Sequence, residues 1–199
     1  MVDELCYLNS YISQNGNCEK EAKVRIGKAS AIFGKVKKVW RNKHINLLTK
    51  LILYEALVLS TLLYGAEVWP LTVTLSKKLE AAHYRWLRGI LGITWRDKVT
   101  NEEVRKRTGH IFLEKVIRER TMRWVGYVTR MDEGRIPKQA LHWKVAGFKR
   151  RPGRPRMNWR NVVKKDPQRM GLTWEEVETS ARDRHSWRQC VALCIGGAV

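Results

Sequence analysis

Residues 19–40, EKEAKVRIGKASAIFGKVKKVW, form the pattern that most strongly indicates the fold class. Their apolar side chains recur every three or four residues, which is the spacing of one helix face. These side chains are Ala22, Ile26, Ala29, Phe33, Val36 and Trp40. The opposite face is rich in lysine. The stretch therefore predicts an amphipathic helix with one side in a core and a basic side in solvent.

Three further stretches have the same helical pattern. Asn46 can cap a helix over residues 47–69, which Pro70 would end. A helix over residues 76–91 would bury one side, made of Leu79, His83, Trp86, Leu87 and Ile90. A helix over residues 112–131 would turn inward the side chains of Val116, Trp124, Val128 and Met131. The chain is therefore predicted to be mainly α.

Two capping boxes and one strand signal complete the predicted elements. TNEE at residues 100–103 and TWEE at 173–176 match the pattern that opens a helix, so helices are expected over 101–108 and 174–194. Residues 5–13 alternate enough for a short N-terminal β-strand or hairpin arm, closed by the turn signal QNGN at 14–17. Strand and helix patterns do not alternate along the sequence, so a parallel sheet is not expected.

A basic stretch near the C-terminus, FKRRPGRPRMNW at residues 148–159, points to a partner. It holds five cations and no acid, and its two prolines and one glycine favour an extended backbone. The cations are Lys149, Arg150, Arg151, Arg154 and Arg156. The core Gly153-Arg154-Pro155 resembles the AT-hook, which lies in the DNA minor groove. A solvated linker is the alternative interpretation.

The charge of the whole chain supports nucleic acid as the partner. The net charge is +20, and residues 104–165 carry 19 Lys and Arg against four acidic residues. Such a field gives salt-sensitive, largely sequence-independent affinity for nucleic acid. Arg118, Arg123 and Arg130 on the predicted helix over 112–131 would add cations. A membrane partner is not expected, because polar residues interrupt the most apolar run, residues 47–63.

Nine tryptophans could provide stacking platforms for bases, but most have the spacing of core residues. Trp159 directly follows the basic stretch and is the one favoured for a contact. His185, Cys190 and Cys194 could supply three metal ligands but lack a fourth, so buried apolar cysteines are the preferred interpretation and no metal site is assigned.

No catalytic motif stands out, and the compartment is expected to be intracellular. The sequence contains no phosphate-binding glycine loop, no nucleophile elbow and no paired carboxylates, so no catalytic residue is assigned. Asp3 and Glu4 argue against a signal peptide, and four scattered cysteines argue against a secreted disulfide framework. A nuclear or cytoplasmic protein is expected, not a secreted one.

The order of segments resembles the thumb and C-terminal segment of the endonuclease/reverse transcriptase of non-LTR (LINE-type) retrotransposons, without the fingers and palm. YLNSYI at residues 7–12 is similar to the primer-grip strand Tyr-Leu-Gly-Ser-x-Ile. LLYGAEVW at 62–69, LRGILGITWRD at 87–97 and DRHSWR at 183–188 follow in the family's order. WVGYVTRM at 124–131 resembles Trp-x-Gly-His-x-x-Arg-Met. The resemblance covers residues 5–190, nearly the whole chain.

The resemblance implies a division of the chain into five segments. A primer-grip-like strand over residues 1–15 would contain Tyr7, Leu8, Asn9 and Ser10. A thumb-like helical bundle would span 16–98, and a basic helical segment would span 99–147. The basic Pro/Gly ribbon would span 148–160 and act as an extended linker to a C-terminal helical segment over 161–199.

The resemblance also implies a non-catalytic portion of an RNA-directed DNA polymerase that binds template–primer, RNA or target DNA. The metal-binding aspartates and their Mg²⁺ would belong to the absent palm, so no cofactor is expected here. The expected contacts with nucleic acid come from the basic ribbon and its neighbours: Lys149, Arg150, Arg151, Gly153, Arg154, Pro155, Arg156, Trp159, Arg118, Arg123 and Arg130. Within this series the ribbon is better interpreted as a general backbone grip than as an AT-hook.

The sequence departs from the family's pattern in three places. Asn9 replaces the family's glycine, Tyr127 replaces its histidine, and the Cys-Cys-His-Cys knuckle of some relatives is missing. The alternative function is a helical protein-interaction module, or a domesticated retroelement remnant, that binds an acidic partner. Self-association through an exposed palm-docking face is a further expectation.

Overall fold

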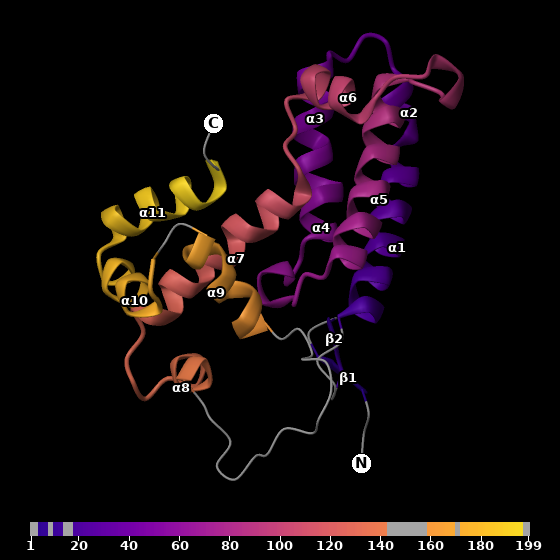
Figure 1. Cartoon of the computed structure of the whole chain (residues 1–199). Coiled ribbons are helices and arrows are strands. Elements are labelled where there is room, and N and C mark those ends of the chain that lie inside the picture. Colours follow the sequence, from indigo (N-terminus) through magenta and orange to yellow (C-terminus); the bar gives the residue numbers. More distant parts are fainter. Residues whose placement is uncertain (1–3, 8–9, 14–17, 143–158, 170–171, 197–199) are drawn as a thin grey trace. The chain divides into compact units, whose positions relative to one another are not determined.

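The computed structural model describes residues 4–7, 10–13, 18–142, 159–169 and 172–196, and confirms a mainly helical chain with a short N-terminal hairpin (Figure 1). The chain forms two compact units. Unit 1 comprises Met1–Ala66 and Leu71–Val116, and unit 2 comprises Glu67–Pro70 and Ile117–Val199. None of the helices in the described ranges is long and apolar enough to cross a membrane.

The N-terminal hairpin pairs strand β1, Glu4–Tyr7, with strand β2, Ser10–Ser13. The strands are antiparallel, with Tyr7 opposite Ser10. The chain therefore reverses between Tyr7 and Ser10, and the prediction that the turn signal at 14–17 closes the hairpin was wrong. Residues 8–9 and 14–17 lie outside the described residues. The antiparallel ladder runs from Glu4 opposite Ser13 to Tyr7 opposite Ser10, so both strands of the hairpin lie before residue 14.

A buried ion pair attaches the hairpin to the first helix, α1 (Glu19–Lys35). Arg25 Nε donates to Glu21 Oε1 at 2.6 Å, and both side chains are almost fully buried. Glu21 Oε2 accepts the Tyr11 amide at 2.6 Å, and Arg25 Nη2 donates to Ser10 Oγ at 3.0 Å. Because each charge has further hydrogen-bond partners, the pair holds β2 on α1 without an unsatisfied charge.

The helix predicted over residues 19–40 is divided. After α1, the short α2 (Lys37–Arg41) begins beyond Val36. The Trp40 indole is buried, donates to the Phe33 carbonyl at 2.9 Å and stacks on the Phe33 ring. The predicted apolar face is therefore kept across the break.

The helix predicted over residues 47–69 was too long. The structure has α3 (Leu47–Leu53), the π-helical η1 (Tyr54–Leu59), α4 (Ser60–Leu62) and then the 3-10 helix η2 (Ala66–Val68). Asn46 caps α3 as predicted, because its side chain accepts the Thr49 amide. Gly65 has φ 71°, a left-handed conformation that ends helices. Gly65 therefore separates α4 from η2 before Pro70 is reached.

The central helix of unit 1 is α5, Val73–Leu91. Thr72 caps its start, and Gly92 with φ 69° closes its end. The predicted buried side is confirmed for all its members: Leu79, His83, Trp86, Leu87 and Ile90. The short η3 (Trp95–Asp97) leads to α6 (Asn101–Thr108), which Thr100 caps as predicted.

Two histidines and a tyrosine meet inside unit 1. Tyr54 Oη and His83 Nδ1 share a hydrogen bond of 2.7 Å, and the His110 ring packs edge-on against both rings. Within the described residues, Nε2 of His83 is buried without a hydrogen-bond partner. Burial lowers the pKa of His83 to about 3, with His110 acting in the same direction. Burial also lowers the pKa of His110, although Glu55 opposes it.

Acid should therefore destabilise unit 1. Histidine in the unfolded chain titrates near pH 6.5, so the unfolded chain binds a proton before folded His83 does. The stability that neutral His83 contributes is complete above this pH and is lost as the pH falls toward 3. We expect the free energy of unfolding to fall by about 2 to 3 kcal/mol between about pH 6.5 and 4.5, measured by denaturant titration.

Histidine variants provide the control for this expectation. His83→Asn should reduce the pH dependence of unfolding over this range, whatever its effect at neutral pH. His44 is exposed, so His44→Asn should leave the pH dependence as in the parent chain. An unchanged pH dependence in His83→Asn would contradict the assignment.

Unit 2 is built around α7, Leu113–Thr129, whose first four residues belong to unit 1. It also contains α8 (Ile136–His142), α9 (Trp159–Arg169), α10 (Trp174–Arg182) and α11 (Arg184–Gly196). Its core joins α7 to the last three helices through Met122, Val125, Val163, Val177, Ala181, Trp187, Cys190 and Val191. Cys190 is thus a small core residue, as predicted for this cysteine.

Two expectations about these helices need correction. Of the side chains predicted to face inward from α7, only Val128 is fully buried, and Trp124 is half-buried. Met122 and Val125 are buried more deeply, because the last three helices pack on that side of α7. The helix predicted over 174–194 is broken at Asp183, whose side chain accepts the Ser186 amide at 2.7 Å and caps α11.

Candidate nucleic-acid interface

Most of the residues predicted to bind nucleic acid lie outside the described part of the chain. The ribbon residues Lys149, Arg150, Arg151, Gly153, Arg154, Pro155 and Arg156 all fall in this group. Of the primer-grip-like residues, Leu8 and Asn9 do so as well, whereas Tyr7 and Ser10 pair in the hairpin. Binding by the ribbon stays a prediction.

The three arginines predicted on the helix over 112–131 differ in their surroundings, and Arg130 follows the last residue of α7. Arg123 is largely exposed and forms an ion pair with Glu119 one turn away. Arg118 is half-buried. Arg130 Nη1 donates to the Ala181 carbonyl at the end of α10, at 2.6 Å. Arg130 therefore helps to hold α10 on α7, and Arg123 is the most accessible of the three.

Trp159 is half-buried at the start of α9 rather than fully exposed. Its Nε1 donates to the Glu67 carbonyl at 2.7 Å, and the ring packs against the core of unit 2. The remaining face lines a pocket with Trp124. Trp159 thus combines a structural role with an accessible aromatic surface.

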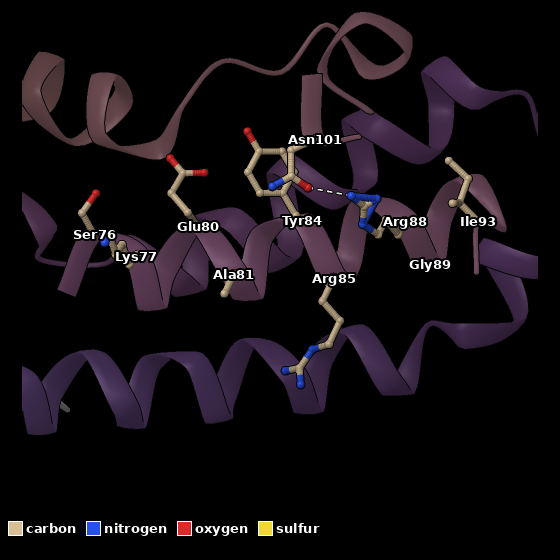
Figure 2. A pocket seen from close by; sticks show the side chains of 10 residues that line it. All are labelled: Ser76, Lys77, Glu80, Ala81, Tyr84, Arg85, Arg88, Gly89, Ile93 and Asn101. Atoms are coloured by element: carbon tan, nitrogen blue, oxygen red, sulfur yellow. Dashed lines mark hydrogen bonds between the residues drawn. The ribbon is translucent and has the colours of Figure 1, made fainter. Parts of the chain in front are cut away.

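A cationic stripe on α5 was missed by sequence reasoning. Lys77, Lys78, Ala81 and Arg85 are exposed on the side of α5 that faces away from its core contacts, and we call them the α5 ridge. Figure 2 shows Arg85 leaving the helix on the side opposite to Glu80 and Tyr84. The spacing of Lys77, Ala81 and Arg85 by four residues could have revealed the ridge, since such positions share a helix face.

A groove of about 900 Å³ lies between α1 and α5, and we call it the α1–α5 groove. Its apolar lining includes Ala22, Ile26 and Leu75. Four cations border it against one acid, Glu19, and they are Lys20, Lys23, Lys78 and Arg85. Lys78 pairs with Glu19 at 3.5 Å. In the described part of the chain, Lys23, Lys77 and Arg85 form no ion pair, so their charges are available to an anion.

A second hollow, of about 630 Å³, lies on the other side of the ridge toward α6 (Figure 2). Arg88 Nη2 donates to the Val99 carbonyl at 3.1 Å and to Asn101 Oδ1 at 2.6 Å, which fixes the start of α6. Burial raises the pKa of Glu80, although its carboxylate accepts the Leu113 amide. Arg88 and Glu80 are therefore used internally, whereas Lys77 and Arg85 border this hollow from the ridge.

Gly89, which lines the second hollow, leaves room for the packing of α1 on α5. A Cβ at this position would lie 3.2 Å from Phe33 Cζ, so the glycine lets α1 and α5 approach. The packing of α1 on α5 thus holds in place the helix faces that carry the ridge and the α1–α5 groove.

The chain is similar to a protein of Caenorhabditis elegans that is named as an uncharacterized transposon-derived protein. The two are 28% identical over 196 residues, which is 94% of this chain and 69% of the relative. No family model matches the chain. No solved structure matches it significantly. The similarity supports a transposon-related origin.

Proposed function

We propose that this chain binds nucleic acid through the α5 ridge and the α1–α5 groove, as the thumb and C-terminal portion of a non-LTR retrotransposon reverse transcriptase. The observation that carries the proposal is that Lys23, Lys77 and Arg85 form no ion pair in the described part of the chain. Lys23 and Arg85 line the groove, and Lys77 is exposed on the α5 ridge. Phosphates repeat along a strand, and a helix presents cations at regular intervals to such a row. The proposal assigns binding, and no chemical step, to the chain.

Two observations support the retroelement part of the proposal. The relative named as transposon-derived aligns along almost the entire chain. The ordered motifs over residues 5–190 resemble the thumb and tail of LINE-type enzymes, and their helical segments form helices here. A thumb clasps a template–primer duplex, so an RNA–DNA hybrid is the proposed ligand for unit 1.

A triple substitution tests the α5 ridge and the α1–α5 groove together. Lys23→Ala, Lys77→Ala and Arg85→Ala together should weaken binding to a short RNA–DNA hybrid by about 10- to 100-fold at physiological salt. The slope of log affinity against log salt should become shallower by about 2 to 3, because each phosphate contact releases about one counterion. Fluorescence anisotropy of a labelled hybrid, titrated between about 50 and 200 mM salt, measures both quantities.

The matched control removes three exposed lysines from elsewhere in unit 1. Lys37→Ala, Lys38→Ala and Lys43→Ala cause the same change in net charge but lie outside the groove. The control should lose much less affinity than the ridge triple variant. Equal losses in the two triple variants would mean that net charge alone drives binding, and the ridge would not be the interface.

The apolar lining of the α1–α5 groove favours one alternative, an acidic amphipathic helix of a partner protein. Such a helix would place its apolar face on Ala22, Ile26 and Leu75 and its acidic rim on the cations. Competition separates the two functions. A short hybrid that displaces an acidic peptide supports a shared site, whereas a chain that binds the peptide and no nucleic acid supports the alternative.

A further inference from the structure

A pocket of about 430 Å³ lies within unit 2 and has an aromatic lining. Two indole rings line it, Trp124 from α7 and Trp159 from the start of α9. Val68, Val128, Pro137 and Leu141 contribute apolar surface. The volume falls within the range of sites that hold small planar ligands.

The two indoles are held in place by contacts outside the pocket. Trp159 Nε1 donates to the Glu67 carbonyl, and Thr121 Oγ1 donates to the same oxygen at 3.3 Å. The Trp124 ring packs on the Tyr127 ring, with centroids 5.6 Å apart. Rings that are fixed before binding lose little entropy when a ligand stacks on them.

The helix that completes the lining is also anchored. The Lys138 ammonium of α8 donates to the Thr129 carbonyl at the end of α7 and forms an ion pair with Glu133 at 3.5 Å. Because the Lys138 side chain is almost fully buried, separating α8 from α7 would lose both this hydrogen bond and the packing of the lysine stem. The pocket is therefore preformed.

We infer that this pocket takes one unstacked base of a single-stranded nucleic acid. Apolar walls with two indoles suit a planar heterocycle, and stacking on an aromatic ring tolerates any base. The phosphates of such a strand suit the net charge of +20 and the largely exposed Arg123, one position before Trp124 on α7. The inference rests on the proposed function and adds a ligand class, an extruded base, to it.

The experiment compares two strands that have equal charge. One is a short oligothymidine and the other is an abasic deoxyribose–phosphate strand of the same length. The parent chain should bind the thymidine strand about 5- to 100-fold more tightly, which is the contribution of one stacked base. Trp124→Leu should bring the ratio of the two affinities close to one and leave the salt dependence unchanged.

Two further variants keep the test decisive. Ala140→Leu narrows the pocket without removing an indole, and it should also lower the ratio of the two affinities. It replaces Trp124→Leu in the test if that variant does not fold. Trp95→Leu removes an indole that is 85% exposed in unit 1 and should leave the ratio unchanged. A parent chain that binds both strands equally overturns the base pocket but not the proposed function, and so does an unchanged ratio in Trp124→Leu and Ala140→Leu. A parent chain that binds neither strand and no short hybrid overturns both the base pocket and the proposed function.

Discussion

Gly126→Ala is expected to unfold unit 2. A Cβ at this position in the middle of α7 would overlap Nε1 and Cδ1 of Trp187. The Trp187 ring is buried on the α7 backbone and donates to the Met122 carbonyl at 3.1 Å. The ring would have to leave the core, and the loss of a buried tryptophan costs about 3 to 5 kcal/mol. That cost is comparable to the stability of a small domain.

The same change at other glycines provides the controls. A Cβ at Gly134 in unit 2, or at Gly27 in α1, would meet no atom within 4 Å. Gly134→Ala should be nearly neutral, and Gly27→Ala should stabilise unit 1 by about 0.5 to 1 kcal/mol, because alanine favours helix. Circular dichroism and denaturant titration measure these changes.

A double variant identifies the contact that is responsible. If the overlap with Trp187 is the cause, Trp187→Leu combined with Gly126→Ala should be about as stable as Trp187→Leu alone, since neighbouring effects are not additive. A well-folded Gly126→Ala single variant, with the parent unfolding midpoint, would contradict the packing of Trp187 on α7.

Helix positions were predictable where a local pattern determines them. The apolar side of α5 gave its buried residues correctly, because one stripe at helical spacing faces one core. Thr100 and Thr173 marked helix starts, since a capping side chain acts within four residues. The break at Asp183 was missed although Asp183 is itself a cap, because the apolar spacing on both sides continues without a gap.

Contacts between distant residues were not predictable. Gly126 in a helix looks like a defect until Trp187, 61 positions later, is placed on it. Trp159 is separated by 92 positions from Glu67, which holds its indole. The phase of α7 was misjudged because the α9–α11 helices that cover it are distant in sequence. The α5 ridge was predictable in principle, because Lys77, Ala81 and Arg85 are spaced by four residues and share one helix face.

Removing the charge of the basic ribbon should have the largest effect on binding. Replacing Lys149, Arg150, Arg151, Arg154 and Arg156 with alanine should raise the Kd for a short nucleic acid on the order of 100-fold at physiological salt. The salt slope should fall by about 3 to 5, because up to five counterions are no longer released. Residues 148–159 contain no acidic residue that would offset these five positive charges. Anisotropy titrations in a salt series give both values.

A control with equal charge tests whether the ribbon acts as a site. Residues 35–43 also hold five exposed cations, namely Lys35, Lys37, Lys38, Arg41 and Lys43. Their replacement lowers the net charge equally, so it reports the contribution of the overall field. The ribbon variant should lose at least about tenfold more affinity than this control. Unchanged affinity and salt slope in the ribbon variant would contradict the ribbon hypothesis.

The same ribbon variant separates a backbone grip from groove recognition. An AT-hook would prefer A·T-rich duplexes, because arginine favours the narrow, strongly negative minor groove of such DNA. A connector that neutralises phosphates has no such preference. We expect the parent chain to bind A·T-rich and G·C-rich duplexes of equal length with similar affinity, and the ribbon variant to lose the same factor on both. A loss confined to A·T-rich DNA would restore the AT-hook interpretation.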